Sequence, residues 1–161
     1  MIGVSLLISL FIYLFYRTEK TVVNDLVIRL ISITTYTNLK VAIVHNLPLN
    51  DVVIYSLPEG LWIFCITLTS KPYYISLNQR RIDCVYFSLI FCFSLEMLQL
   101  IHVTNGRFDM MDICVFVPFW LLGRYGLINS AEKRHLLTTA NSKTLICFIS
   151  YGIVYLAHVL K

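Results

Sequence analysis

The stretch CVYFSLIFCFSLEMLQLIHV, residues 84–103, decides the fold class. It is apolar apart from two serines, Glu96, Gln99 and His102. About 20 mostly apolar residues are what an α-helix needs to cross a bilayer. The stretch therefore predicts a transmembrane helix, and the remaining segments can be interpreted outward from it.

The composition of the whole chain is also typical of a membrane protein. Of its 161 residues, 58% are hydrophobic and 14% are charged, and the mean hydropathy is +0.75. A soluble domain has about 25% charged residues, and one as apolar as this chain would expose large apolar patches and aggregate. The net charge of +4 comes from cations scattered between apolar runs. Such cations flank membrane spans, so they do not favour nucleic acid as a partner.

Further apolar runs predict four more spans. Together with 84–103, the predicted spans cover approximately residues 2–18, 52–70, 112–128 and 144–160. Pro58 lies within the run 52–70, so we expect that helix to be kinked or to begin late. Residues 26–44 carry Arg29, Lys40 and several hydroxyls, which favours an interfacial amphipathic helix or a surface helical hairpin over a span. The predicted fold is all-α: a polytopic membrane helical bundle with about five transmembrane helices in one domain, residues 1–161.

The distribution of cations predicts the orientation. The connections 73–83 and 129–143 are basic, whereas 104–111 holds only Arg107. Short cytoplasmic loops carry the excess of Lys and Arg. We therefore expect the N-terminus inside, and the connection between the third and fourth spans on the outer face.

Polar residues gather around that outer connection. Glu96 and Gln99 are three residues apart, so they share one helix face, which His102 continues. Asp109 and Asp112 have the same spacing where the next helix begins. A carboxylate in hydrocarbon is costly, and an intramembrane ionisable residue is by default a functional-site hypothesis.

These residue types indicate acid–base chemistry or the binding of an anion. Glu96, Asp109 and Asp112 are candidate catalytic acids and bases. Asp109 and Asp112 could also hold a divalent cation that bridges to a phosphate, although the chain has no established metal-binding motif. Arg107 is the candidate for binding an anionic head group, with Gln99 orienting it.

Two further residues complete the candidate binding set. His102 lies on the same helix face as Glu96. Glu59 follows Pro58 at a helix start, where its side chain either enters the same cavity as Glu96 or only begins the helix. A structural interpretation stays open for the whole set. Aspartates at a helix start cap free N–H groups, and Glu96 with Gln99 can join two helices by hydrogen bonds.

The same residues resemble a known family signature. Glu96-Met97-Leu98-Gln99, then Gly106-Arg107, then Asp109-Met110-Met111-Asp112 is similar to the pattern of the VanZ-like family of small bacterial integral membrane proteins. The segment Ile54–Trp62 resembles one found in short members of Bacteroidetes type. The likeness covers roughly residues 51–123.

The resemblance implies a location and a class of function. We expect an integral protein of the bacterial cytoplasmic (inner) membrane that binds or processes a lipid-linked or phosphorylated cell-envelope molecule. The alternative is a non-catalytic structural or accessory subunit of a larger membrane complex. The expected partners are accordingly membrane lipids or an envelope protein complex, and whether the protein is an enzyme stays open.

Overall fold

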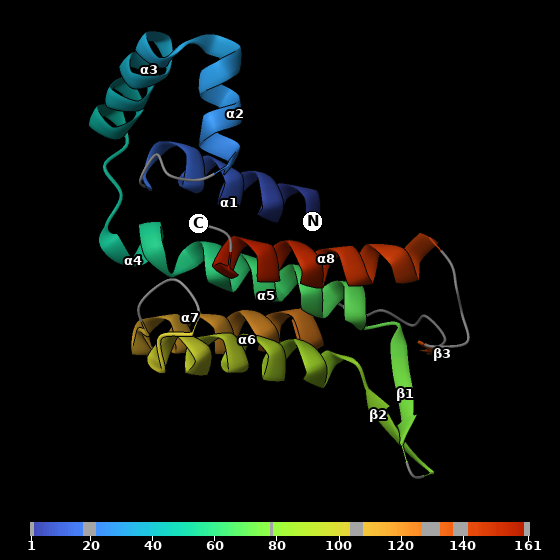
Figure 1. Ribbon diagram of the computed structural model, residues 1–161. Helices are drawn as coiled ribbons and strands as arrows, with labels where there is room; N and C mark the ends of the chain where they lie inside the picture. Colours follow the sequence, from blue (N-terminus) through green and yellow to red (C-terminus); the bar gives the residue numbers. More distant parts are fainter. Residues whose placement is uncertain are drawn as a thin grey trace.

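The computed structural model describes residues 2–17, 22–77, 79–103, 108–126, 133–136 and 142–159. Over these residues the chain is mostly helical, which confirms the helical fold class (Figure 1). The helices are α1 (Ile2–Phe15), α2 (Val22–Ile31), α3 (Ile33–Asn46), α4 (Asp51–Tyr55), α5 (Leu57–Ser70), α6 (Val85–Leu100), α7 (Met110–Leu121), the π-helical turn η1 (Leu122–Gly126) and α8 (Ser142–Val159). The strands are β1 (Tyr73–Leu77), β2 (Arg80–Asp83) and β3 (Arg134–His135).

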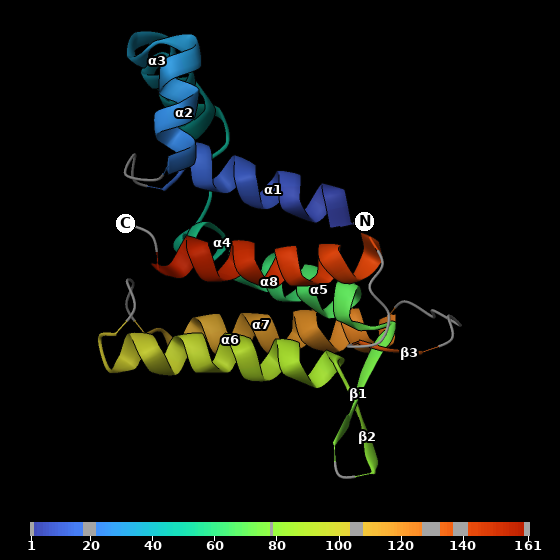
Figure 2. The same cartoon turned by 45° about the vertical axis from the view of Figure 1, so that its right-hand side comes forward.

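Helix α5 is the centre of a bundle of long helices. It contacts α1, α6, α7 and α8, which run alongside it in both views (Figures 1 and 2). Apolar residues occur all around α5, as expected for a helix buried on every side. The main hydrophobic core is built on its Ile63 and Ile66, against Leu95 of α6, Phe116 of α7 and Val154 of α8.

The run 52–70 is interrupted near its start, as its proline predicts. Helix α4 is capped by Asn50, whose side chain accepts a hydrogen bond from the Val53 N–H at 2.9 Å. Ser56 separates α4 from α5, and Pro58 lies in the first turn of α5, where its missing N–H costs no helical hydrogen bond. The combined stretch Asp51–Ser70 has 20 residues and a mean hydropathy of 1.6. Within the described residues it is the one helix long and apolar enough to cross a membrane, since the other apolar helices are shorter.

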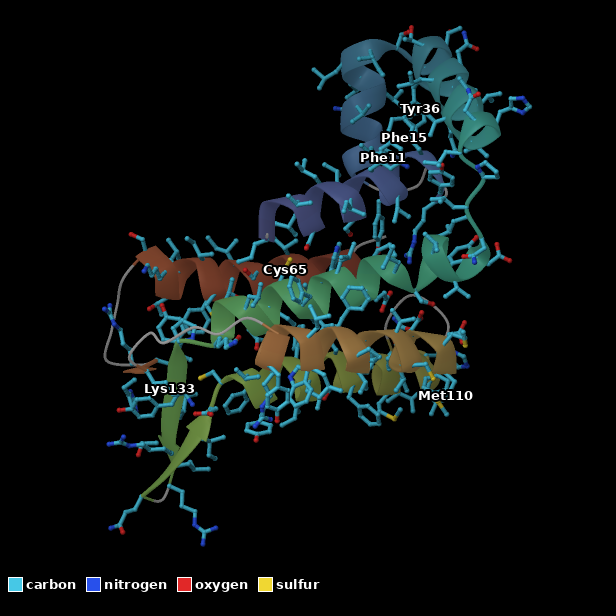
Figure 3. All side chains as sticks on the ribbon, turned by 180° about the vertical axis from the view of Figure 1, so that it is seen from behind. Phe11, Phe15, Tyr36, Cys65, Met110 and Lys133 are labelled. Atoms are coloured by element: carbon cyan, nitrogen blue, oxygen red, sulfur yellow. The ribbon has the colours of Figure 1, made fainter. Side chains whose placement is uncertain are left out.

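The bundle has apolar side chains on its outside. Side chains project outward along its helices (Figure 3). Many large apolar residues are exposed, for example Leu7 of α1, Ile90 of α6 and Leu145 of α8, which are 66%, 59% and 60% exposed. No described polar layer covers these faces of the helices, because their neighbours Val4, Phe93 and Ile149 are exposed as well.

Hydroxyl groups, by contrast, are buried between the helices. Thr67 of α5 and Ser88 of α6 are both 0% exposed, and their hydroxyl oxygens lie 2.9 Å apart. Ser70 of α5 makes a similar contact with the Tyr151 hydroxyl of α8, also at 2.9 Å. Polar contacts of this kind join helices where no water is available to satisfy them.

Glycines let α5 and α7 approach closely. A Cβ on Gly60 would lie 2.6 Å from Cδ2 of Phe119 and 2.9 Å from Cγ1 of Val115, both on α7. A Cβ on Gly123, just after α7, would lie 3.0 Å from Cγ2 of Thr67. The two glycines therefore fix how near these helices can come.

Residues 26–44 belong to two helices, α2 and α3, which form a helical hairpin to one side of the bundle (Figure 1). The break falls at Ser32, whose φ of 70° lies in the left-handed region. Tyr36 of α3 is fully buried against α1: its ring stacks on Phe15 at 6.3 Å, and its hydroxyl donates to the Leu14 carbonyl (Figure 3). Of the two arrangements that the sequence left open, the described residues form the hairpin.

The connection 73–83 differs from the expected polar loop, because most of it forms a β-hairpin. Strands β1 and β2 pair antiparallel, with Tyr74 opposite Asp83, and β3 adds to β1 in parallel. The physical reason is that Tyr73-Tyr74-Ile75 is a run of strong strand formers, and Gln79 adopts a φ of 65° that suits a tight turn. The purely α-helical prediction missed this sheet.

Candidate functional site

Three carboxylates from three helices converge in the bundle. Glu59 comes from α5, Glu96 from α6 and Asp112 from α7, and one carboxylate oxygen of each lies within 4.8 Å of those of the other two. Glu96 is 2% exposed and Asp112 8% exposed. We call these three residues the carboxylate cluster.

Chain direction explains why these residues meet. Helix α6 begins beside the β-hairpin and runs away from it, so Glu96 lies one turn before its far end (Figure 1). Helix α7 returns from that far end, which places Asp112 in its first turn. Glu59 lies in the first turn of α5, whose N-terminus is at the same end. Helix N-termini favour negative charge, so two of the three carboxylates occupy favourable positions.

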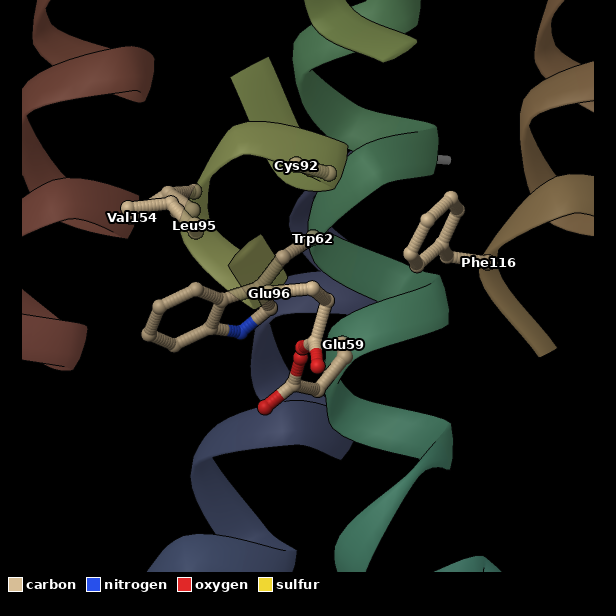
Figure 4. A pocket seen from close by; sticks show the side chains of 7 residues that line it. All are labelled: Glu59, Trp62, Cys92, Leu95, Glu96, Phe116 and Val154. Carbon is tan, nitrogen blue, oxygen red and sulfur yellow. The ribbon is translucent and has the colours of Figure 1, made fainter. Parts of the chain in front are cut away.

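A small cavity lies beside the cluster. Its polar lining comes from Glu59 and Glu96, whose carboxylates approach one another in Figure 4. Its other walls are Trp62, Cys92, Leu95, Phe116 and Val154. The cavity volume is about 10 Å³, close to the smallest space that holds one water molecule. Charges act on one another strongly in such apolar surroundings.

Trp62 ties this cavity to α1. Its indole N–H donates to the hydroxyl of Ser9, which is 1% exposed. Its ring also stacks on Tyr13, with centroids 5.6 Å apart. Helix α1 is thereby held against the cluster end of α5.

Arg17 is a functional candidate that the sequence did not single out. It follows α1, and its guanidinium donates to the carbonyl of Tyr55 at 2.6 Å and to the Tyr13 hydroxyl at 3.1 Å. The guanidinium also lies over the Tyr13 ring, 4.4 Å from its centroid, and interacts electrostatically with Asp112. Arg17 is therefore a cation that the structure places near the cluster, whereas Arg107, the cation expected there, lies outside the described residues.

One oxygen of Asp112 has no hydrogen-bond donor among the described residues. The Ser56 hydroxyl bonds to this carboxylate. The atom Oδ1, however, is buried and accepts no hydrogen bond from any described residue. A buried acceptor left without a donor costs about 1–3 kcal/mol, and more when it is charged. Such an atom in a native fold calls for an explanation.

The other candidates that the structure describes are Gln99, His102 and Asp109. Gln99 is buried about one turn beyond Glu96 on α6. His102 is exposed and lies after the end of α6 with a φ of 58°, so it does not continue this helix as the sequence suggested. Asp109 is exposed and caps α7, since its side chain accepts a hydrogen bond from the Met111 N–H at 2.9 Å. Asp112 is thus grouped with Glu59 and Glu96, and not with Asp109 as the sequence suggested for a cation.

Asp109→Asn is expected to have little effect. Asn caps helices as well as Asp does, so we expect the free energy of unfolding to change by less than about 0.5 kcal/mol, whereas Asp109→Ala should cost about 1 kcal/mol. Thermal melting of the two variants, followed by circular dichroism, measures the difference. If Asn were as damaging as Ala, capping would not be the role of this residue.

No protein-family model, curated protein or solved structure matches this chain. The chemistry of the site therefore follows from its geometry alone. Three grouped carboxylates, two of them buried, can share protons, act as acid and base, or coordinate a cation, and Arg17 interacts electrostatically with one of them.

Proposed function

We propose that the chain is a polytopic protein of the bacterial cytoplasmic membrane, with the cell-envelope role that its VanZ-like residues imply. In this proposal the carboxylate cluster and Arg17 bind the phosphorylated head group of a lipid-linked envelope molecule. The observation that carries the proposal is the convergence of Glu59, Glu96 and Asp112 at one end of an externally apolar bundle.

The membrane part of the proposal is supported by where the side chains lie. The outward faces of α1, α6 and α8 expose large apolar residues, while hydroxyl pairs such as Thr67 and Ser88 are buried between helices. Lipid solvates the first kind of surface and water does not. At 1.5 Å per residue, Asp51–Ser70 is about 30 Å long, close to the thickness of the hydrocarbon core.

The site part is supported by the cost of the cluster. Ionisable groups inside a membrane bundle are expensive, and such a group is by default a functional-site hypothesis. The cluster lies at the end of the bundle where α6 ends and α7 begins (Figure 1). A head group could reach it there while its hydrocarbon tail lies along the exposed apolar faces.

Binding of a polyprenyl monophosphate tests the proposal. The full chain, in lipid nanodiscs with Mg²⁺ present, should bind this lipid at least about tenfold more tightly than the matched polyprenol, by native mass spectrometry or fluorescence titration. Glu96→Gln and Asp112→Asn should remove most of that preference. Asp51→Asn, at an exposed carboxylate in α4, is the matched control and should keep it.

Two results would contradict the proposal. One is equal affinity of the wild-type chain for the phosphate and the alcohol. The other is an unchanged preference in Glu96→Gln and Asp112→Asn variants whose helical content equals that of the wild type.

A further inference from the structure

We propose that Glu59, Glu96 and Asp112 bind a hard divalent cation, of the class of Ca²⁺, Mn²⁺ and Mg²⁺. This inference deepens the proposed function, and rests on it for its role, because the cation would join the carboxylates to a phosphate. Cation binding itself can be measured without any lipid.

The spacing of the carboxylates suits such an ion. Oxygens bind Ca²⁺ at about 2.3–2.6 Å, so two ligands on opposite sides of the ion are about 5 Å apart. The three cluster oxygens all lie within 4.8 Å of one another. One Ca²⁺ ion can therefore bind all three oxygens with small side-chain movements. Mn²⁺ or Mg²⁺, which are smaller, would bring the three oxygens slightly closer to one another.

An independent observation is the buried oxygen of Asp112. Asp112 is 8% exposed, and its Oδ1 has no hydrogen-bond partner among the described residues. Ser56 bonds to the same carboxylate and so restrains it. A cation bound to Oδ1 would replace the missing donor and remove the cost of burying this atom.

Charge balance favours a divalent over a monovalent ion. The ionised cluster carries three negative charges, and Arg17 interacts electrostatically with Asp112. A divalent cation offsets more of the cluster's negative charge than a monovalent cation does. In surroundings of low polarity, an uncompensated charge is among the costliest features a fold can have.

The donor set favours hard cations. All three grouped donors are carboxylate oxygens, which suit Mg²⁺, Ca²⁺ and Mn²⁺, whereas softer ions favour His or Cys. The adjoining cavity, lined by Glu59 and Glu96, has room for about one water molecule to complete the coordination.

Mn²⁺ binding to the full chain in detergent, followed by electron paramagnetic resonance, tests the inference. We expect one saturable site per chain, from which Ca²⁺ or Mg²⁺ displaces Mn²⁺. Glu96→Gln and Asp112→Asn should each weaken Mn²⁺ binding at least tenfold, and Asp51→Asn should change it less than twofold. Absence of a saturable site in the wild-type chain would overturn the inference. So would a Mn²⁺ affinity in both Glu96→Gln and Asp112→Asn equal to that of the wild type.

A second measurement needs no variant and so does not depend on the variants folding. A cation that binds only the folded chain raises its melting temperature. We expect a rise with Mn²⁺ over an EDTA-treated sample and no comparable rise with the same ionic strength of K⁺; equal melting temperatures would overturn the inference.

The inference and the proposed function fail in different ways. Saturable Mn²⁺ binding without any preference for polyprenyl phosphate supports the cation site and removes its proposed role. Preference for the phosphate that persists in EDTA, with no Mn²⁺ binding, keeps the lipid function and overturns the cation site.

Discussion

Gly60→Leu is expected to unfold or rearrange the cluster end of the bundle. A Cβ at this position would already lie 2.6 Å from Phe119 and 2.9 Å from Val115, and leucine adds three more carbons in the same direction. Overpacking a well-packed contact costs about 1–3 kcal/mol, and we expect the upper end or more here. In a chain of this size, that lowers the melting temperature by roughly 6–12 °C. Because Glu59 adjoins Gly60, the cluster should be disturbed too.

Gly152→Leu is the matched control, since it makes the same substitution within helix α8. A Cβ at Gly152 would meet no atom within 4 Å, so the side chain has open space. The stability of the Gly152→Leu variant should equal or slightly exceed that of the wild type, because leucine has a higher helix propensity than glycine.

Adding Phe119→Ala to Gly60→Leu should restore part of the lost stability, because the smaller side chain at position 119 makes room for the leucine. The effects of substitutions at contacting residues are not additive, so a double-mutant cycle measures this coupling. Equal melting temperatures for Gly60→Leu and the wild type would mean that α5 and α7 are not in close contact.

Arg17→Met is expected to destabilise the chain most when no divalent cation is present. The variant loses the hydrogen bonds to the Tyr55 carbonyl and the Tyr13 hydroxyl and the stacking on Tyr13. It also leaves the carboxylate cluster without this nearby positive charge. Hydrogen bonds from a charged donor contribute about 1.5–3 kcal/mol. We therefore expect a loss of about 2–3 kcal/mol in EDTA and a smaller loss in Mn²⁺, by thermal melting.

Arg124→Met provides the comparison for Arg17→Met. Arg124 also donates to a tyrosine hydroxyl, that of Tyr86 at 2.6 Å, and lies 4.4 Å from the centroid of that ring. It follows the C-terminal end of α7, whereas Asp112 lies at the start of that helix. Its loss should cost the same in EDTA and in Mn²⁺. If Arg17→Met likewise showed no dependence on the cation, Arg17 would act on the packing of α1 and not on the cluster.

Part of the site was predictable from local sequence. The three-residue spacing of Glu96 and Gln99 places both on the buried face of α6, and both are buried. Asp109 at a helix start indicated an N-cap as an alternative to catalysis, and the backbone hydrogen bond from Met111 bears out the capping. These features depend on helix geometry within a few residues, which sequence spacing describes well.

The partner of Asp112 was not predictable in this way. Asp109 is its neighbour along the chain, yet Glu59 and Glu96 are its neighbours in space. Gly60, next to Glu59, lets α5 approach α7, the helix that carries Asp112. Arg17 was not singled out from the sequence, because nothing in its own segment indicates that α1 packs against α5.

The sequence by itself determined that an apolar helix with a carboxylate near its end lies within residues 84–103, where the structure has α6 from Val85 to Leu100, and that apolar helices dominate the chain. Those properties follow from side-chain hydrophobicity and periodicity, which act locally. The tertiary structure decided which carboxylates meet and which arginine interacts with them. Those outcomes depend on how closely the helices pack and where each runs, and both are set by contacts between residues far apart in the sequence, such as Gly60 and Phe119.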